Sequence, residues 1–272
     1  SLQPMDRRTP GPDEVEIAVT ASGLNFRSVL DALGLYPGDA GPLGGDCVGT
    51  VSAVGSGVQH LAVGDAVMTI APFGRFVTVD AGGVVRQPQA LTPAQAATVP
   101  VPFLTAWLAL RELKQLQPGE RVLIHAAAGG VGLAAVQLAL WGGAEVFATA
   151  SPTKWAALEA MGVARTHIAS SRTLEFAEDF RKICGPRGMD VVLNSLAGEF
   201  VDASLSLLKA GGHFVEMGKI DLRDPAAVAA AHPGVRYQVF DILELGVERT
   251  RAILEQVTQG FNAGHLRALP AQ

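Results

Sequence analysis

The chain has 272 residues, of which 49% are hydrophobic and 17% charged, and this composition excludes a disordered protein and leaves room for one large or two smaller domains. The net charge is -5 and the densest basic run is Arg7-Arg8, so we expect neither nucleic acid nor a membrane surface as partner. Two cysteines, Cys47 and Cys184, argue against a disulfide framework and favour a reducing, cytoplasmic setting.

Short strand patterns bounded by glycine fill the first 100 residues. They lie at 15–19, 49–55, 64–70 and 76–79. Such closely spaced short strands predict a small, mainly β barrel or sandwich.

After Pro100 the pattern changes to alternating strands and helices. The predicted strands are 122–125, 145–150, 166–169, 190–194, 213–217 and 237–240, and the predicted helices are 131–141, 154–161, 176–183, 200–208 and 248–259. Strands separated by helices predict an α/β, doubly wound parallel sheet of the Rossmann type.

A glycine-rich turn joins the first of these strands to its helix. The run Ala127-x-Gly129-x-x-Gly132 fits the dinucleotide fingerprint, with alanine in place of the first glycine. A helix N-terminus offers amide groups and a positive dipole to phosphates. We therefore predict that five residues bind a nucleotide pyrophosphate: Ala128, Gly129, Gly130, Val131 and Gly132.

The end of the second strand indicates which nucleotide is bound. An acidic residue there would bind the ribose 2′-hydroxyl of NAD, but Ser151 and Lys154 follow this strand, and Arg172 follows the next one. A hydroxyl and two cations favour a 2′-phosphate, and hence NADP(H). The alternative for Lys154 is a solvated residue in the first turn of a helix, although a cation there opposes the helix dipole.

Six stretches of the chain together carry a family resemblance. They are 23–30, 35–38, 125–132, 148–155, 191–200 and 214–219. In these stretches the chain resembles the zinc-free, quinone-oxidoreductase-like branch of the medium-chain dehydrogenase/reductase superfamily, and more closely the enoyl reductase domain of modular (type I) polyketide synthases. The resemblance implies a GroES-like substrate domain over 1–100 and 246–272 and an NADPH-binding Rossmann domain over 101–245.

The sequence departs from the family pattern in two places. Ser28 stands where the family usually has aspartate, and the C-terminal part of the substrate domain is expected to be truncated. Zinc-binding relatives have a cysteine near Asn25 and a histidine near Gly45, and this chain has neither. Cys47 has no neighbouring histidine, so we predict no metal site.

The resemblance implies hydride transfer from NADPH to the β-carbon of an α,β-unsaturated thioester on an acyl carrier protein, beside neighbouring polyketide synthase domains. Such chemistry needs an oxyanion stabiliser and a proton donor. Lys219 and Asp241 follow the strands at 213–217 and 237–240, and matching residues are proposed proton donors in the family. A tyrosine at the position of Tyr36 is associated there with a (2S) α-branch. The alternatives are a solvated Lys219, an Asp241 that caps the next helix, and a Tyr36 packed on Pro37.

Four further residues are weaker candidates. Asn25 and Thr105 resemble positions that line the nicotinamide and substrate, and Asn194 and Ser195 are expected near the cofactor ribose; each is equally consistent with a plain loop residue. His125 is expected to be a core histidine. The alternative functions are a free-standing NADPH quinone or enone reductase and a non-catalytic nucleotide-binding relative. Monomer and dimer both stay open.

Overall fold

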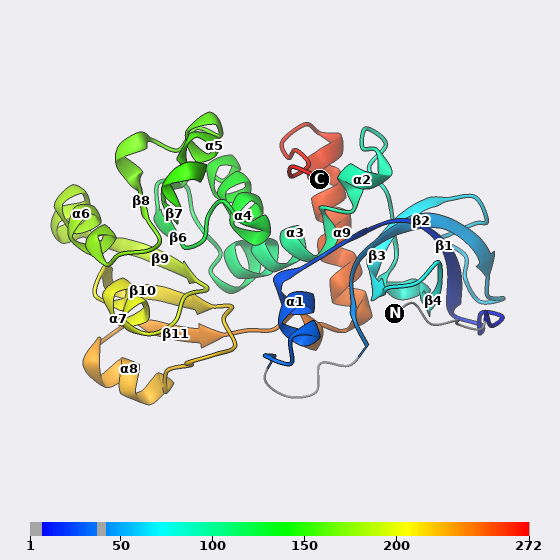
Figure 1. Ribbon diagram of the computed structural model, residues 1–272, viewed down its shortest axis with the longest axis horizontal. Coiled ribbons are helices and arrows are strands. Elements are labelled where there is room, and N and C mark those ends of the chain that lie inside the picture. The colour runs from blue at the N-terminus through cyan, green and yellow to red at the C-terminus, as the bar shows by residue number, and fades with distance from the viewer. Residues whose placement is uncertain (1–6, 37–41, 272) are drawn as a thin grey trace. The chain divides into compact units, whose positions relative to one another are not determined.

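The computed structural model describes residues 7–36 and 42–271, and the chain divides into two compact units. Unit 1 consists of Ser1–Leu104 with Leu243–Gln272, and unit 2 is the continuous segment Thr105–Ile242. Figure 1 shows unit 1 in blue, cyan and red, and unit 2 in green to orange. The assignment of substrate and cofactor to separate domains with bounds at 101 and 245 remains a prediction.

Unit 1 is built on a five-stranded antiparallel sheet. Its strands are β1 (Glu14–Gly23), β2 (Gly44–Val54), β3 (Ala66–Pro72), β4 (Phe76–Asp80) and β5 (Val85–Arg86), in the order β4-β1-β2-β3-β5. Val15 and Ile17 of β1 are fully buried in a cluster with residues of β2, β3 and β4. The mainly β, GroES-like architecture predicted for this part of the chain is confirmed.

The helices of unit 1 come from both of its chain segments. They are α1 (Phe26–Ala32), α2 (Pro93–Ala96), the start of α3 (Pro100–Trp107) and α9 (Gly246–Asn262). The rings of Phe103 and Phe261 meet edge-to-face at 5.0 Å, and the Leu269 amide donates to the Thr98 hydroxyl at 3.1 Å. The returning C-terminal segment therefore packs against the end of the first segment of unit 1.

Unit 2 is a doubly wound, entirely parallel sheet. Its strands are β6 (Arg121–Ile124), β7 (Glu145–Ala150), β8 (Ile168–Ser170), β9 (Met189–Asn194), β10 (Leu208–Glu216) and β11 (Arg236–Val239). The order β11-β10-β9-β6-β7-β8 runs outward from β6 in both directions, as in dinucleotide-binding sheets. The predicted Rossmann fold is confirmed.

Five α-helices connect these strands: α4 (Gly130–Trp141), α5 (Trp155–Ala160), α6 (Glu175–Cys184), α7 (Glu199–Leu205) and α8 (Pro225–Ala231). Helix α8 is not among the predicted helices. Its start is nevertheless well marked, because the Asp224 carboxylate accepts from the Ala226 amide at 2.9 Å and Pro225 occupies the first turn.

His125 is a core residue, as predicted. It is fully buried at the end of β6, and its two ring nitrogens contact the hydroxyls of Thr149 at 2.8 Å and Ser204 at 2.7 Å. Burial lowers the pKa of His125 to about 3, so the ring is neutral and ties β6 to β7 and α7.

Within residues 7–36 and 42–271, no helix combines the length and the apolar character that crossing a membrane requires.

Candidate functional site

The candidate site residues of unit 2 share one edge of its parallel sheet. The strands are in parallel register, with Ile124 beside Ala148, Ala150 beside Ser170, and Glu216 beside Asn194 and Val239. The loops that follow β6 to β11 therefore all leave from the carboxyl edge, where open α/β sheets bind ligands.

The turn between β6 and α4 has the geometry of an anion cradle. Gly129 is the N-cap of α4 and has no side-chain cap, and the first intrahelical hydrogen bond runs from Leu133 N to Gly129 O at 2.8 Å. The amides of the preceding helical residues thus point out of the helix end. A Cβ at Gly132 would lie 2.4 Å from Ala126 O, so only glycine lets the helix approach the turn this closely.

The three residues predicted to bind a 2′-phosphate follow the next two strands. Ser151 precedes a short 3-10 turn that contains Lys154, and Arg172 lies two residues beyond the end of β8. Lys154 and Arg172 are exposed, and the Arg172 amide donates to the Ser170 hydroxyl at 3.1 Å. The two cations thus leave from neighbouring strands at the same edge as the glycine turn.

Asn194 and Ser195, at the end of β9, differ in their surroundings. Asn194 is fully buried, and its amide group is bonded to the Leu196 backbone at 2.8 and 3.2 Å and to Glu216 at 2.7 Å. The Ser195 hydroxyl is buried and has no hydrogen-bond partner within the described residues. Such an orphan beside the glycine turn fits a missing polar ligand, such as the ribose of a nucleotide. Asn194 instead shapes the loop that carries this serine.

Lys219 and Asp241 form an ion pair between the ends of β10 and β11. Their Nζ and Oδ2 atoms are 3.1 Å apart, and Lys219 also donates to Phe240 O at 2.7 Å. The two side chains are 25% and 22% exposed, so the ammonium is fixed in place yet remains in reach of a ligand. The arrangement favours a held proton donor over a freely solvated lysine.

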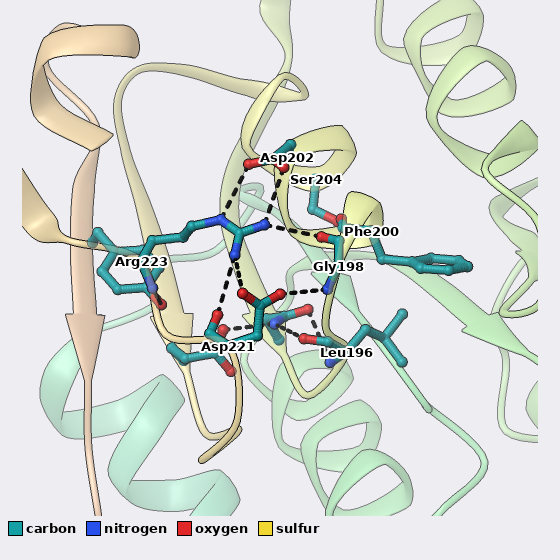
Figure 2. A network of polar contacts seen from close by, with 10 residues as sticks. Leu196, Gly198, Phe200, Asp202, Ser204, Asp221 and Arg223 are labelled. Carbon is teal, nitrogen blue, oxygen red and sulfur yellow. Dashed lines mark hydrogen bonds and ion pairs between the residues drawn. The ribbon is translucent and has the colours of Figure 1, made fainter. Parts of the chain in front are cut away.

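An arginine clamp, which the sequence reading missed, joins the loops after β9 and β10. Figure 2 shows the Arg223 guanidinium between Asp202, Asp221 and the Gly198 carbonyl. Asp221 accepts from the Gly198 amide at 2.6 Å, which closes the clamp from the other side. Three charged residues thereby fix the loop that follows Asn194.

Asn25 of unit 1 is oriented by a buried carboxylate. Its amide nitrogen donates to Asp46 Oδ2 at 2.9 Å, and Asp46 Oδ1 accepts from the Val101 amide at 2.6 Å. Asp46 is 2% exposed, and burial raises its pKa to about 6. A Cβ at Gly23 would lie 2.3 Å from Ala97 O and 2.7 Å from Asp46 Oδ2, so only glycine fits beside this pair. Asp46 is a second residue that the sequence reading missed.

Tyr36 and Ser28 lie in or beside α1. The Arg27 guanidinium lies over the Tyr36 ring, 4.8 Å from its centroid, and Tyr36 is half-buried. Its predicted packing partner Pro37 lies outside the described residues. Ser28 is buried and donates to Gly44 O at 2.8 Å, a contact that an aspartate could not make as a carboxylate. Thr105, the remaining candidate, is buried in α3. The structure describes these residues within their own units, and their roles stay predictions.

Two family models match the chain. An alcohol dehydrogenase GroES-like domain matches residues 11–90, and a zinc-binding dehydrogenase matches residues 130–245.

The side chains of this chain do not fit a zinc site, since no cluster of three or more His, Cys, Asp or Glu in the described ranges could hold a metal ion. Cys47 is buried, and burial raises the pKa of its thiol to about 12, which keeps it protonated.

Alignments with relatives of high identity extend over nearly the whole chain. The chain is 56% identical to the pikromycin polyketide synthase component PikAII of Streptomyces venezuelae over 262 residues, which are 96% of this chain and 7% of that protein. The solved structure of CurK enoyl reductase has a TM-score of 0.92 and 45% identity, over 98% of this chain and 85% of that one. Quinone oxidoreductase from Escherichia coli, solved with NADPH, has a TM-score of 0.87 and 26% identity, over 97% and 84%.

These similarities point to an oxidoreductase with a nicotinamide cofactor, as do the glycine turn and the unpartnered serine at the carboxyl edge of unit 2. The chain belongs to the medium-chain dehydrogenase/reductase superfamily and, within it, to the enoyl reductase domains of modular polyketide synthases.

Proposed function

We propose that the chain reduces an α,β-unsaturated acyl thioester, carried on an acyl carrier protein, with NADPH as the reductant during polyketide chain elongation. The observation that carries this proposal is the Lys219–Asp241 pair at the same sheet edge as the glycine turn. The partners are the carrier protein and the neighbouring domains of the synthase, in line with the multidomain relatives.

The residues of unit 2 fit this cofactor. The first amides of α4 would bind its pyrophosphate, Ser195 would meet a ribose, and Lys154 with Arg172 would bind the 2′-phosphate. When bound, NADPH supplies the hydride.

The protonation step would fall to Lys219. As hydride adds to the β-carbon, the electron pair of the C=C bond moves toward the thioester oxygen and forms an enolate. The Lys219 ammonium gives its proton to the α-carbon, and the neutral amine regains a proton from solvent. Asp241 and Phe240 O hold the ammonium for this transfer. Tyr36 is proposed to orient the enolate.

The test is consumption of NADPH with a crotonyl thioester as substrate. We expect loss of absorbance at the reduced-nicotinamide band and formation of the saturated thioester. Much faster turnover of a quinone would favour the free-standing quinone or enone reductase, which the likeness to the Escherichia coli enzyme keeps open. NADPH binding without turnover of either substrate would instead identify a non-catalytic relative.

A separate prediction concerns the choice between NADPH and NADH. Replacing Lys154 with alanine removes one charge-assisted contact to the 2′-phosphate, so NADPH affinity should fall by roughly 1.5–3 kcal/mol while NADH affinity stays unchanged. Fluorescence titration of both nucleotides measures this difference. Arg165→Ala is a suitable control, because Arg165 lies over the Trp155 ring and pairs with Glu159. Equal losses for the two nucleotides would remove Lys154 from the site.

A further inference from the structure

Glu216 is a buried carboxylate at the carboxyl edge of unit 2 for which the reaction described above has no use. It is the last residue of β10 and is 1% exposed. A carboxylate removed from water in this way is costly unless each oxygen has a partner, so its contacts need an explanation.

Each oxygen of Glu216 is bonded to a different part of the candidate site. Oε2 accepts from Asn194 Nδ2 at 2.7 Å, at the end of the neighbouring strand β9. Oε1 accepts from the Gly218 amide at 2.6 Å, in the loop that leads directly to Lys219. The carboxylate therefore links the loop that carries Ser195 to the loop that carries the proposed proton donor.

Gly218 shows how closely the carboxylate approaches this loop. A Cβ at Gly218 would lie 2.7 Å from Glu216 Oε1. The φ of Gly218 is not positive, so its backbone does not require glycine; a side chain here would instead displace the end of the Glu216 side chain. The segment from Glu216 to Lys219 is thus folded around the carboxylate.

The two N–H donors that face Glu216 require it to act as a double acceptor. Burial raises the pKa of Glu216 above its ordinary value, and the hydrogen bonds from Asn194 and Gly218, with the charges of Lys219 and Arg223, offset only part of that rise. A protonated carboxyl group would turn one of its two acceptor oxygens into a donor that faces an N–H group.

We propose that Glu216 is a positioning residue of the reductase site, which holds the Gly218–Lys219 loop so that the Lys219 ammonium lies at the substrate α-carbon. This inference rests on the proposed function, since it assigns Lys219 the protonation step. Glu216 itself touches neither substrate nor cofactor in this scheme.

The matched control is Asp190, a buried carboxylate at the opposite edge of the same sheet. It is 3% exposed near the start of β9, where it accepts from the Arg121 amide at 2.8 Å and from the ammonium of Lys209. Asp190→Asn and Glu216→Gln each remove one buried charge, and each introduces an NH2 group that faces another N–H donor. A purely structural role would therefore affect both variants alike.

The experiment compares these two variants with the unmodified chain. For Glu216→Gln we expect kcat for the crotonyl thioester to fall by about 10–100-fold, because a small displacement of a catalytic group has effects of this size. NADPH affinity should change by less than about threefold, because the remaining amide oxygen can still accept from Asn194 Nδ2 and hold the Ser195 loop. Asp190→Asn should keep kcat within about threefold. Equal kcat values for the two variants would overturn the inference.

Gly218→Ala provides a second route that leaves the carboxylate in place. The added methyl group pushes Glu216 Oε1 away, so kcat should fall as in Glu216→Gln. The double variant should then lose no more activity than the more affected single variant, because both changes break the same contact. Independent, multiplying losses would contradict a shared role.

Amide hydrogen exchange separates this inference from the proposed function. In Glu216→Gln, exchange at Gly218 and Lys219 should be about tenfold faster than in Asp190→Asn, whether or not the thioester is turned over. If the unmodified chain shows no turnover, the proposed function fails, and this comparison alone decides whether Glu216 holds the loop. Equal exchange rates in the two variants would show that it does not.

Discussion

Replacement of Lys219 by methionine should lower kcat for the crotonyl thioester by about 10²–10⁴-fold, the usual contribution of a positioned general acid. Methionine keeps most of the length of the side chain and removes the ammonium group. The bond to Phe240 O and the pair with Asp241 are both lost, but neither lies at the glycine turn. NADPH affinity, measured by fluorescence titration, should therefore stay unchanged.

The opposite end of β10 offers a matched control for this variant. Lys209 is also paired with an aspartate, the buried Asp190, but at the amino edge of the sheet. Lys209→Met should retain full kcat. If Lys219→Met also retains it, the protonation step must be assigned to another residue, and Tyr36 would be the next to test.

Gly132→Ala should lower both the stability of unit 2 and its affinity for NADPH. The new Cβ would lie 2.4 Å from Ala126 O and 2.5 Å from the Ala127 Cα, and both atoms are backbone and cannot rotate away. We expect a loss of about 1–3 kcal/mol in the free energy of unfolding from this overpacking. Because α4 must move away from the turn, its amides should also lose a charge-assisted contact to the pyrophosphate, worth about 1.5–3 kcal/mol.

Gly142→Ala, at the other end of α4, adds the same methyl group without this clash. Its nearest atoms are the flexible Arg111 guanidinium at 3.2 Å and Leu138 O at 3.3 Å. Chemical unfolding and NADPH titration of both variants should show a large effect for Gly132 and little for Gly142. Similar results at the two positions would mean that α4 does not depend on close packing at the turn.

The fold could be predicted because its signals are local and periodic. Strands with buried residues on both faces, such as β6 and β9, read as continuous apolar runs, and the glycine turn marks the start of α4. Helix α8 was missed although Asp224 and Pro225 mark its start. Its residues are mostly alanines, so the sequence shows no alternation between an apolar and a polar helix face.

Residues of the candidate site could be predicted only where their position in the chain, directly after a strand, already places them at the carboxyl edge of the sheet. Lys219 and Asp241 follow strands that lie side by side in the sheet, so their carboxyl ends had to meet. Glu216, Arg223 and Asp46 gave no such signal, because each depends on a hydrogen bond to a group more than 20 positions away in the sequence. For Asn194, only the position at the end of the strand was predictable. Its side-chain amide is hydrogen-bonded to Leu196 and Glu216 within the protein, and nothing in the sequence indicated these partners.

The division of unit 1 into two chain segments has a consequence for the order of folding. Phe103 and Phe261 belong to one core, whereas the whole of unit 2 lies between them in the sequence. At a synthesis rate of roughly 5–20 residues per second, α9 emerges about 8–30 s after Phe103. Unit 2 is complete before then and can fold as it leaves the ribosome. Until α9 has been synthesised, the β sheet of unit 1 lacks its contacts with this helix. During this interval, the first hundred residues of a newly made chain should be its part most vulnerable to proteolysis and aggregation.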